Sequence, residues 1–252
     1  MQIRDLQIIV TGAASGLGAS AARFLCREGA AVAAVDLDAA GLEALRRELA
    51  GDGGRISIHT ADVSSEQAAI SAVKDAVAAH GAINGLINSA GITRDGLLVH
   101  GDGRKLPLAQ WRKVLDVDLT GTFLMTREVA AHMVARQTSP GVIINLASIS
   151  RHGNIAQSSY AAAKAAVVAD TRVWARELAG YGIRVAAVSP GLIRTPILSE
   201  DLIDPAVLAG YVARIPLGRL GEPREIDAAI RFIIDCDYFT GECVEVNGGF
   251  FF

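Results

Sequence analysis

Short runs of apolar residues alternate with longer segments in which apolar residues recur every three or four positions, from the N-terminus to about residue 191. The short runs are continuous rather than alternating, which is typical of strands buried on both faces of a parallel sheet. The longer segments have the period of amphipathic helices. The predicted strands are 6–11, 30–36, 55–62, 83–91, 141–148 and 183–191, and the predicted helices are 16–29, 39–50, 65–81, 108–136 and 157–180.

Strands that alternate with helices of this length form βαβ units with right-handed crossovers. The pattern therefore predicts an α/β protein with a doubly wound parallel sheet of about seven strands and helices on both faces. No linker, repeat or low-complexity segment divides the chain, so a single domain over 1–252 is expected. Two stretches, 92–107 and 192–217, interrupt the pattern with glycine, proline and charged residues.

Composition narrows the class of protein. Apolar residues make up 51% of the chain and charged residues 20%, which suffices for a full core. The net charge is −3 and no basic run exists, which argues against a nucleic-acid-binding protein. The three cysteines favour free thiols, with a Cys236–Cys243 disulfide as the alternative. We find neither a signal-peptide pattern nor an apolar run long enough to span a membrane, and expect a cytoplasmic protein.

The stretch TGAASGLG (11–18) lies between the first predicted strand and helix. Gly12, Gly16 and Gly18 allow a tight turn and close approach of a ligand, and the amides that start the helix favour an anion. Asp36 ends the second strand, where a carboxylate can bind a ribose diol. The same carboxylate repels a 2′-phosphate, and neighbours such as Leu37 offer no cation. We therefore predict a dinucleotide site that takes NAD rather than NADP.

Tyr160 and Lys164 are four residues apart in the Ala-rich segment SSYAAAKAAV (158–167), so a helix places them on one face. Taken alone, a tyrosine and a lysine at this spacing most often lie on the protein surface and have no catalytic role. With TGAASGLG, Asp62-Val63, NSAG (88–91), Ser148 and PG (190–191) in this order, the chain resembles the short-chain dehydrogenase/reductase family from about residue 6 to its end. The resemblance implies a single-domain Rossmann fold, a nicotinamide cofactor and oxidoreductase activity. Ser89 replaces the second asparagine of the family's N-N-A-G motif.

The resemblance also implies site residues. The implied cofactor-binding residues are Gly12, Ser15, Gly16, Leu17, Gly18, Asp36, Leu37, Asp62, Val63, Asn88, Ala90, Gly91, Tyr160, Lys164, Pro190, Gly191, Ile193 and Thr195. The implied catalytic residues are Ser148, Tyr160, Lys164 and Asp118. Asp118 stands where the family usually has an asparagine, whose backbone carbonyl binds a water that links the lysine to solvent.

Hydride transfer from an alcohol leaves a proton that the protein must accept. A free tyrosine, with a pKa of about 10, is a weak base at neutral pH, and an adjacent ammonium lowers that pKa. Lys164 is thus expected to activate Tyr160, and Ser148 to stabilise charge on the substrate oxygen. His152 is interpreted as a surface or substrate-loop residue. The other histidines show no metal-ligand spacing, and we predict no metal.

The resulting prediction is an NAD-dependent enzyme that interconverts a secondary alcohol and a ketone. Segment 192–217 is interpreted as a largely apolar lid, and residues 99–107 as a loop extension that touches substrate or a neighbouring subunit. The alternative is a 3-oxoacyl-thioester reductase, with a carrier protein or CoA, or a 3-hydroxyacyl-CoA dehydrogenase. Because carrier-protein reductases of the family generally use NADP, Asp36 argues mildly against that alternative. A remote alternative is a nucleotide-sensing regulator without turnover.

A homotetramer is the expected assembly, because the family resemblance implies helix pairing and segments 108–136 and 157–180 carry apolar and small faces. The chain also ends in Phe250, Phe251 and Phe252. Three exposed phenylalanines would form an apolar patch, so they are expected against a partner subunit or the substrate pocket. The alternative is that the tail folds back on its own sheet.

Overall fold

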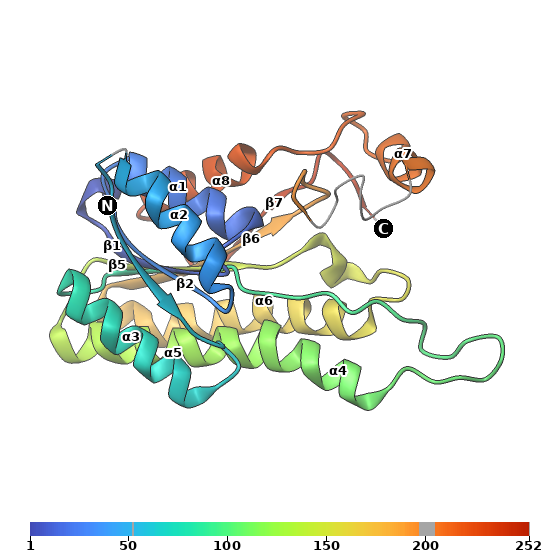
Figure 1. Cartoon of the computed structure of the whole chain (residues 1–252), viewed down its shortest axis with the longest axis horizontal. Coiled ribbons are helices and arrows are strands. Elements are labelled where there is room, and N and C mark those ends of the chain that lie inside the picture. The colour runs from blue at the N-terminus through green and yellow to red at the C-terminus, as the bar shows by residue number, and fades with distance from the viewer. Residues whose placement is uncertain (52, 197–204, 252) are drawn as a thin grey trace.

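The computed structural model describes residues 1–51, 53–196 and 205–251, and its centre is a seven-stranded sheet (Figure 1). The strands are β1 (Gln7–Thr11), β2 (Ala31–Asp36), β3 (Arg55–Thr60), β4 (Gly85–Asn88), β5 (Gly141–Leu146), β6 (Ile183–Pro190) and β7 (Cys243–Val246). Their order is β3-β2-β1-β4-β5-β6-β7, and each neighbouring pair is parallel. The predicted fold class is confirmed.

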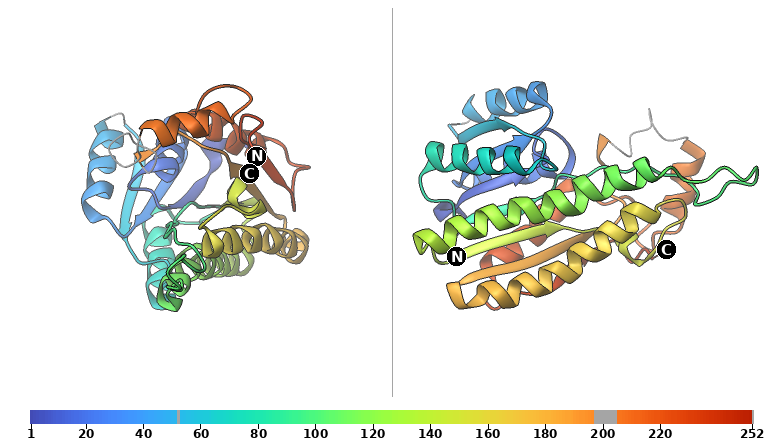
Figure 2. Two further views of the ribbon diagram at one scale, coloured as in Figure 1. Left: turned by 90° about the vertical axis from the view of Figure 1, so that its right-hand side faces the viewer. Right: turned by 90° about the horizontal axis from the view of Figure 1, so that it is seen from below.

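Helices cover the two faces of this sheet as separate layers (Figures 1 and 2). One layer holds α1 (Gly16–Arg27), α2 (Ala39–Gly51) and α8 (Pro223–Asp235). The other holds α3 (Glu66–His80), α4 (Leu108–Leu115), α5 (Gly121–Arg136) and α6 (Ser158–Leu178). Helix α7 (Pro205–Ala213) lies beyond the carboxyl ends of the strands, and the short turns are η1 (Ile3–Asp5), η2 (Asp116–Thr120), η3 (Ile149–His152) and η4 (Ala179–Tyr181).

Strand β1 pairs with both β2 and β4, so the order of the strands reverses beside it. The chain runs outward through β2 to β3 and then crosses back to β4 on the other side of β1. The loops after β1 and β4 therefore diverge to opposite faces of the sheet. The crevice between them, at the carboxyl ends of the strands, is where ligands bind in open α/β sheets.

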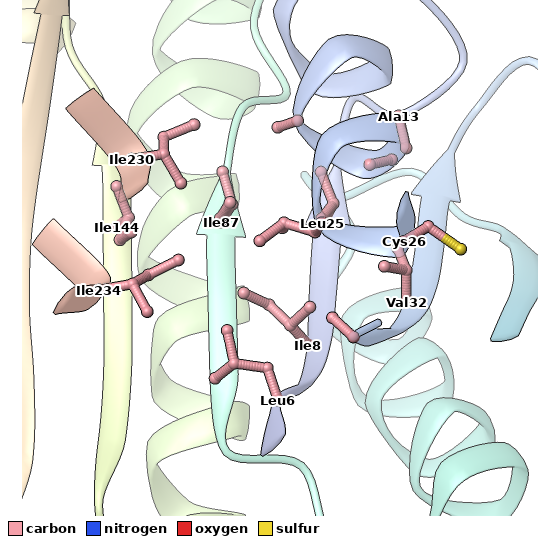
Figure 3. Close-up of a cluster of buried hydrophobic side chains, with 14 of the residues drawn as sticks. Leu6, Ile8, Ala13, Leu25, Cys26, Val32, Ile87, Ile144, Ile230 and Ile234 are labelled. Atoms are coloured by element: carbon pink, nitrogen blue, oxygen red, sulfur yellow. The ribbon is translucent and has the colours of Figure 1, made fainter. Parts of the chain in front are cut away.

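Two apolar clusters hold the layers to the sheet, one on each face. Figure 3 shows the first, in which Ile230 and Ile234 of α8 lie beside Ile144 of β5. Each of these side chains is at most 1% exposed, and full burial of an isoleucine contributes about 1.5–3 kcal/mol. The expectation of strands buried on both faces holds for the inner strands. The edge strands β3 and β7 are mostly half-buried, because each has one neighbouring strand.

Helix α8 and strand β7 are absent from the sequence-based prediction. Helix α8 begins with a capping box, in which Glu222 and Glu225 each bond the backbone N–H of the other, and Pro223 is in its first turn. Its buried residues recur at helical spacing: Ile226, Ala229, Ile230, Ile233 and Ile234. Both signals are readable in the sequence. Strand β7 has only four residues, too short for a recognisable pattern.

The C-terminal tail and the proposed lid pack against each other. Phe250 is fully buried with Ile149, Ile215 and Leu220 of its own chain, and Arg214 lies over its ring at 5.0 Å. For Phe250 the prediction of a partner subunit is therefore wrong, because its own chain covers it. Phe251 is 65% exposed in the single chain. Phe252 and the lid residues Ile197, Leu198, Glu200, Asp201, Leu202, Ile203 and Asp204 lie outside the described residues.

Cys236 and Cys243 do not form a disulfide, so that alternative is wrong. Burial raises the pKa of the Cys243 thiol to about 11. In the parts of the chain that the structure describes, no helix is both long and apolar enough to cross a membrane.

Candidate active site

The turn between β1 and α1 brings Gly12, Gly16 and Gly18 to the carboxyl edge of the sheet. Gly12 and Gly16 have φ values of +67° and +56°, a region where a Cβ causes strain. A Cβ on Gly18 would collide with the Gly12 carbonyl, so this glycine lets α1 start against the turn. A Cβ on Gly16 would meet no atom within 4 Å, so the backbone there faces open space. The turn thus has the shape and the free amides of a phosphate site.

The hydroxyl of Thr11, the last residue of β1, joins this turn to the loop after β4. It accepts hydrogen bonds from the backbone N–H groups of Ser89 and Ala90, both at 3.1 Å. A Cβ on Gly12 would lie 2.8 Å from the backbone of Ala90, so the two loops pack directly on each other. The floor of the crevice is therefore a single packed unit built from β1 and β4.

Asp36 lies half-buried at the end of β2 with both carboxylate oxygens bonded to backbone. One oxygen accepts from the Ala14 N–H at 2.9 Å and the other from the Asp38 N–H at 3.0 Å. These bonds fix the carboxylate against the glycine turn. Leu37 follows it and is 68% exposed, and both residues line the cavity described below.

Asp62 and Val63 follow β3 and line the same cavity. The Ser64 hydroxyl and N–H donate to Asp62 at 2.6 and 2.9 Å, and these bonds lower the pKa of that carboxyl. Val63 is 6% exposed and packs against α5, where a Cβ on Gly121 would lie 2.7 Å from the valine side chain. Because Gly121 has no side chain, the start of α5 packs directly against Val63 in this wall of the cavity.

Asn88 does not line the cavity, although Ala90 and Gly91 do. Its side-chain amide donates to Thr126 and to Asn145, each at 2.9 Å, and the Asn145 amide donates to Thr171 at 2.9 Å. The Asn88 side chain is therefore turned away from the cavity, and cofactor binding by this residue stays a prediction. Its side chain belongs to a buried network that fastens β4 and β5 to α5 and α6.

Ser148 follows β5 and caps η3. Its Oγ accepts a hydrogen bond from the Ser150 N–H at 3.1 Å, and the residue is 9% exposed. A hydroxyl can accept one such bond and still donate its own hydrogen, so Ser148 can donate to a ligand in the cavity that it lines. A hydroxyl in this position can bind a substrate carbonyl oxygen.

Tyr160 and Lys164 lie in the first two turns of α6 and both line the cavity. The Lys164 ammonium lies 5.5 Å from the centroid of the Tyr160 ring. Lys164 is 4% exposed and donates to the Leu146 carbonyl, at the end of β5, at 3.1 Å. The end of β5 thus holds the ammonium beside the phenol.

Asp118 lies directly behind the cavity wall and is fully buried. One carboxylate oxygen accepts from the Ile92 N–H at 2.8 Å, and the other lies 3.3 Å from Lys164 Nζ. Burial raises the pKa of Asp118, opposed by the charge of Lys164. For Lys164 burial lowers the pKa, but the Asp118 and Tyr160 charges outweigh it, so the net shift is upward. The pair therefore keeps Lys164 protonated.

The predicted helix 108–136 contains a π-helical turn, η2, and Asp118 sits in it. The Gly121 N–H bonds to the Asp116 carbonyl, five residues back. The Asp118 carbonyl accepts a hydrogen bond from the Thr122 hydroxyl at 2.9 Å.

Pro190, Gly191, Ile193 and Thr195 continue from β6 along the opposite wall of the cavity. A Cβ on Gly191 would lie 2.6 Å from the Asn247 backbone, so only glycine fits beneath the loop after β7. That segment 192–217 forms a lid stays a prediction. Leu192 and Ile193 line the cavity, whereas Leu208 and Val212 of α7 pack on the Phe250 cluster instead.

The sequence-based prediction misses part of the cavity wall. The additional charged and polar lining residues are Arg94, Asp95, Lys113, Ser150, Asn154, Gln157 and Tyr211. Gln157 lies three residues before Tyr160, so helical spacing alone would have placed it on the same side of α6. Arg94 and Asp95 precede the extension 99–107, which folds as a hairpin closed by a Val99–Lys105 bridge and extends from the body (Figure 2).

His152 lies outside the cavity, as interpreted from the sequence. It is half exposed and bonds to Glu245 at 2.9 Å, beside the Arg151–Glu245 ion pair. Within the described ranges, no group of three or more His, Cys, Asp or Glu residues is arranged to hold a metal ion.

The residues described above as lining the cavity surround a volume of about 760 Å³, at the crevice where the strand order reverses. Asp36 is bonded to the glycine turn through the Ala14 N–H, and Ser148 lines the same cavity as the Tyr160–Lys164 pair of α6. The arrangement can hold an extended dinucleotide, donate to a carbonyl oxygen and exchange a proton with it.

Sequence comparisons agree with this geometry. Residues 12–251 match the family model described as enoyl-(acyl carrier protein) reductase. The chain is 37% identical to the 3-oxoacyl-[acyl-carrier-protein] reductase FabG of Thermotoga maritima, with 99% of each chain covered. It is 38% identical to the (2S)-[(R)-hydroxy(phenyl)methyl]succinyl-CoA dehydrogenase subunit BbsD of Thauera aromatica, with 99% of this chain and 98% of the relative covered.

A third relative is the (3R)-3-hydroxyacyl-CoA dehydrogenase of Homo sapiens, which is 38% identical and is aligned over 99% of this chain and 97% of its own length. These matches span nearly the whole chain. The chain therefore belongs to the short-chain dehydrogenase/reductase family of oxidoreductases.

Proposed function

We propose that the protein interconverts 3-hydroxyacyl and 3-oxoacyl thioesters by hydride transfer, with NAD as the cofactor. The observation that carries this proposal is that Ser148, Tyr160 and Lys164 line the same cavity as the glycine turn and Asp36. A cofactor held by the turn reaches the tyrosine within one continuous space. The sequence-based interpretation put a general secondary alcohol first and the thioester second. The three relatives described above favour the second, since their names specify acyl-carrier-protein or CoA substrates.

In this mechanism the bound nicotinamide supplies or accepts the hydride, and the protein handles the proton. In the reducing direction the Tyr160 hydroxyl donates its proton to the carbonyl oxygen that becomes the alcohol. Ser148 donates a hydrogen bond to the same oxygen, and the Lys164 ammonium stabilises the phenolate that Tyr160 leaves behind. In the oxidising direction Tyr160 accepts the proton. Asp118 acts on Lys164 from behind and touches neither substrate nor cofactor.

The residues proposed to hold the cofactor follow the cavity wall. Gly12, Ser15, Gly16, Leu17 and Gly18 hold the pyrophosphate and nearby ribose, and Asp36 and Leu37 the adenosine ribose. Asp62 and Val63 flank the adenine, Ala90 and Gly91 form the floor, and Lys164 holds the nicotinamide ribose with Tyr160 beside it. Pro190, Gly191, Ile193 and Thr195 orient the nicotinamide.

The preference for NAD rests on the charge beside the adenosine ribose. The carboxylate of Asp36 is fixed there, and Asp38 caps α2 next to it by accepting from the Ala40 and Gly41 N–H groups at 3.1 Å. The cations among the described residues that line the cavity are Arg94, Lys113 and Lys164, and none belongs to the β2–α2 segment. A 2′-phosphate there would meet the carboxylate of Asp36 and no cation of that segment.

The thioester is favoured over a small ketone by the shape of the substrate end. The cavity is bounded there by apolar residues of segment 192–196 and Tyr211, which suits an acyl chain, and by Arg94, an exposed cation. A regulator without turnover is the remaining alternative, and the complete set of Ser148, Tyr160 and Lys164 speaks against it. We further propose one dinucleotide-binding and catalytic domain over 1–252, a cytoplasmic homotetramer, no metal, and no membrane or nucleic-acid partner.

The test is turnover followed by the absorbance of the reduced nicotinamide. Purified protein is given NADH or NADPH with acetoacetyl-CoA, a longer 3-oxoacyl-CoA, the same acyl groups on a carrier protein, and simple aryl ketones. We expect the largest kcat/KM with an acyl thioester and NADH. A larger kcat/KM for an aryl ketone would return the general secondary-alcohol interpretation to first place, and binding of NADH without turnover of any ketone would support the regulator.

A further inference from the structure

Two loops meet on the wall of the cavity through the side chain of Gln157, at the start of α6. The Gln157 amide nitrogen donates to the Asp95 carboxylate, at 3.1 and 3.2 Å from its two oxygens. The Gln157 amide oxygen accepts from the Ser150 hydroxyl at 2.9 Å and from the Asn154 amide at 3.0 Å. All four side chains line the cavity, so this cluster, the Gln157 junction, belongs to the site.

The junction is connected directly to Ser148. The backbone N–H of Ser150 donates to Ser148 Oγ at 3.1 Å, while the Ser150 hydroxyl donates to Gln157. A chain of contacts therefore runs from the exposed carboxylate of Asp95 through Gln157 and the covalent frame of Ser150 to the Ser148 hydroxyl, which is proposed to bind the substrate oxygen. A backbone bond runs beside it, from the Gly96 N–H to the Ala156 carbonyl at 2.8 Å.

The carboxylate of Asp95 decides which atom of the Gln157 amide faces which neighbour. A glutamine side chain can present either its oxygen or its nitrogen to a neighbour, but a carboxylate only accepts. With Asp95 on one side, the Gln157 nitrogen must face Asp95 and its oxygen must face Ser150 and Asn154. The backbone beside Gln157 is itself constrained, because Ala156 has a φ of +67°, which is unfavourable for a residue with a Cβ. External contacts such as those of Asp95 and Gly96 hold it there.

We propose that Asp95 is a positioning residue for Ser148, acting through Gln157 and Ser150. It holds the junction, and with it the Ser150 backbone, in the position from which the Ser150 N–H donates to Ser148 Oγ and so places that hydroxyl for the substrate oxygen. The inference rests on the proposed function for the role of Ser148, but the junction itself is a property of the chain. Asp95 is exposed, and its contacts here are with other side chains of the site and with Gln110, whose amide donates to its backbone carbonyl.

The experiment is a charge-exchange series with the variants Asp95→Leu, Asp95→Asn, Gln157→Glu and the double variant Asp95→Asn/Gln157→Glu. The Leu variant removes the acceptor, and Gln157→Glu places two carboxylates against each other. In Asp95→Asn the new amide oxygen still accepts from Gln157. In the double variant the amide introduced at position 95 donates to the carboxylate introduced at position 157, whose oxygens still accept from Ser150 and Asn154. Asp102→Leu, an exposed acid of the same loop paired with Arg104, is the matched control.

We expect Asp95→Leu and Gln157→Glu to lower kcat and kcat/KM together by about tenfold, which corresponds to about 1.4 kcal/mol of transition-state stabilisation. Asp95→Asn and the double variant should stay within about threefold of the unchanged enzyme, or about 0.7 kcal/mol. The affinity for NADH should not change in any variant, since the junction lies away from Asp36. A double variant no better than Gln157→Glu would overturn the proposal, because a merely structural role is not restored by exchanging the two groups.

Amide hydrogen exchange of the segment 148–157 gives a readout that does not need turnover. We expect this segment to exchange faster in Asp95→Leu and Gln157→Glu, and at the original rate in the double variant and in Asp102→Leu. Unchanged exchange in Asp95→Leu would overturn the inference even if the protein proved to have no ketone substrate. Absence of turnover in the unchanged protein, with the exchange pattern as expected, would instead refute the proposed function and leave the junction established.

Discussion

The ammonium of Lys164 lies 3.3 Å from the carboxylate of Asp118, and both side chains are shielded from water. Breaking a buried pair by removing one partner leaves an uncompensated charge. The lysine that is proposed to assist Tyr160 is therefore itself held by an anion on the side away from the cavity. The two carboxylate oxygens have different partners, since the second accepts from the Ile92 N–H.

The variant Asp118→Asn should remain active and shift the alkaline limb of its pH profile toward lower pH. The Asn oxygen can still accept from Ile92, but its NH₂ group then faces the ammonium and cannot bond to it. Without the anion, the pKa of Lys164 loses the main cause of its upward shift, and burial lowers it. Profiles of log(kcat/KM) against pH should differ by no more than about one unit, or about 1.4 kcal/mol. Asp116→Asn, an exposed acid of the same turn, is the control. An inactive Asn variant would give Asp118 a role of its own.

The variant Tyr160→Phe should lose at least about 100-fold in kcat, the usual loss when a general acid–base is removed. The ring remains to pack on α6, so NADH binding, followed by fluorescence titration, should persist. Tyr181→Phe removes the hydroxyl of an exposed tyrosine and should behave as the unchanged enzyme. Retention of more than about a tenth of kcat in the Tyr160 variant would assign the proton transfer to another residue.

Replacing the negative charge beside the adenosine ribose with a positive one should change the cofactor preference. In the double variant Asp36→Ser/Leu37→Arg, a guanidinium replaces an exposed leucine and the fixed carboxylate is lost. The ratio of kcat/KM for NADH to that for NADPH should fall by about 10- to 100-fold, because a hydrogen bond to a charged group is worth about 1.5–3 kcal/mol. Asp38→Asn keeps the cap of α2 and serves as the control. An unchanged enzyme that uses NADPH as well as NADH would refute the assignment of NAD.

Acid should loosen α8 through Glu225. Arg219 donates to both of its carboxylate oxygens and the Glu222 N–H to one, and these bonds lower the pKa of Glu225 to about 2. A lowered pKa contributes stability above the unfolded value of 4.5, and this contribution is lost as the pH falls toward 2. Glu225→Gln should lower the free energy of unfolding at pH 7 by about 0.5–1 kcal/mol, since the group is partly exposed. Urea titrations at pH 7 and pH 3 should show a smaller difference between the two proteins at pH 3. Glu242→Gln, in an exposed ion pair with Arg172, should change neither value.

The proposed homotetramer is tested at Phe123 of α5 and Val173 of α6. Both are apolar side chains more than 40% exposed in the single chain, on helices of the same layer. Phe123→Asp/Val173→Asp should shift the sedimentation coefficient at micromolar concentration toward a smaller species, because burying an unpaired charge is unfavourable. Leu217→Asp, at an exposed leucine elsewhere, should leave it unchanged. A monomeric unchanged protein would rule out the assembly.

The sequence predicts most of the fold because the inner strands and the longer helices carry strong periodic patterns. It predicts the phosphate turn and the tyrosine–lysine pair because these depend on neighbours along the chain. The position of Asn88 shows the limit of such inference. Asn88 is the last residue of β4, at the carboxyl ends of the strands where a ligand is expected. Its amide nevertheless belongs to the buried network with Asn145, which is 57 residues away in the sequence.

The same limit applies to Asp95, Gln157 and Tyr211, which come from three separate loops or helices. Their convergence depends on how the loop after β4, the start of α6 and helix α7 pack over the strand ends. No local pattern encodes that packing. The burial of Phe250 is similar, because the residues that cover it, Ile149 and Leu220, come from distant segments.

The π-helical turn at 116–120 has a consequence for insertions and deletions. It holds one residue more than an α-helical turn, so α4 and α5 are out of phase by about 100° around a shared axis. Removal of Leu119 or Thr120 from this turn would restore an unbroken α-helix. Everything before it would then rotate by that angle and advance by about 1.5 Å. The carboxylate facing Lys164 would leave its place although no residue in contact with the lysine had changed. This helix therefore tolerates exchange of its side chains far better than any change in its length.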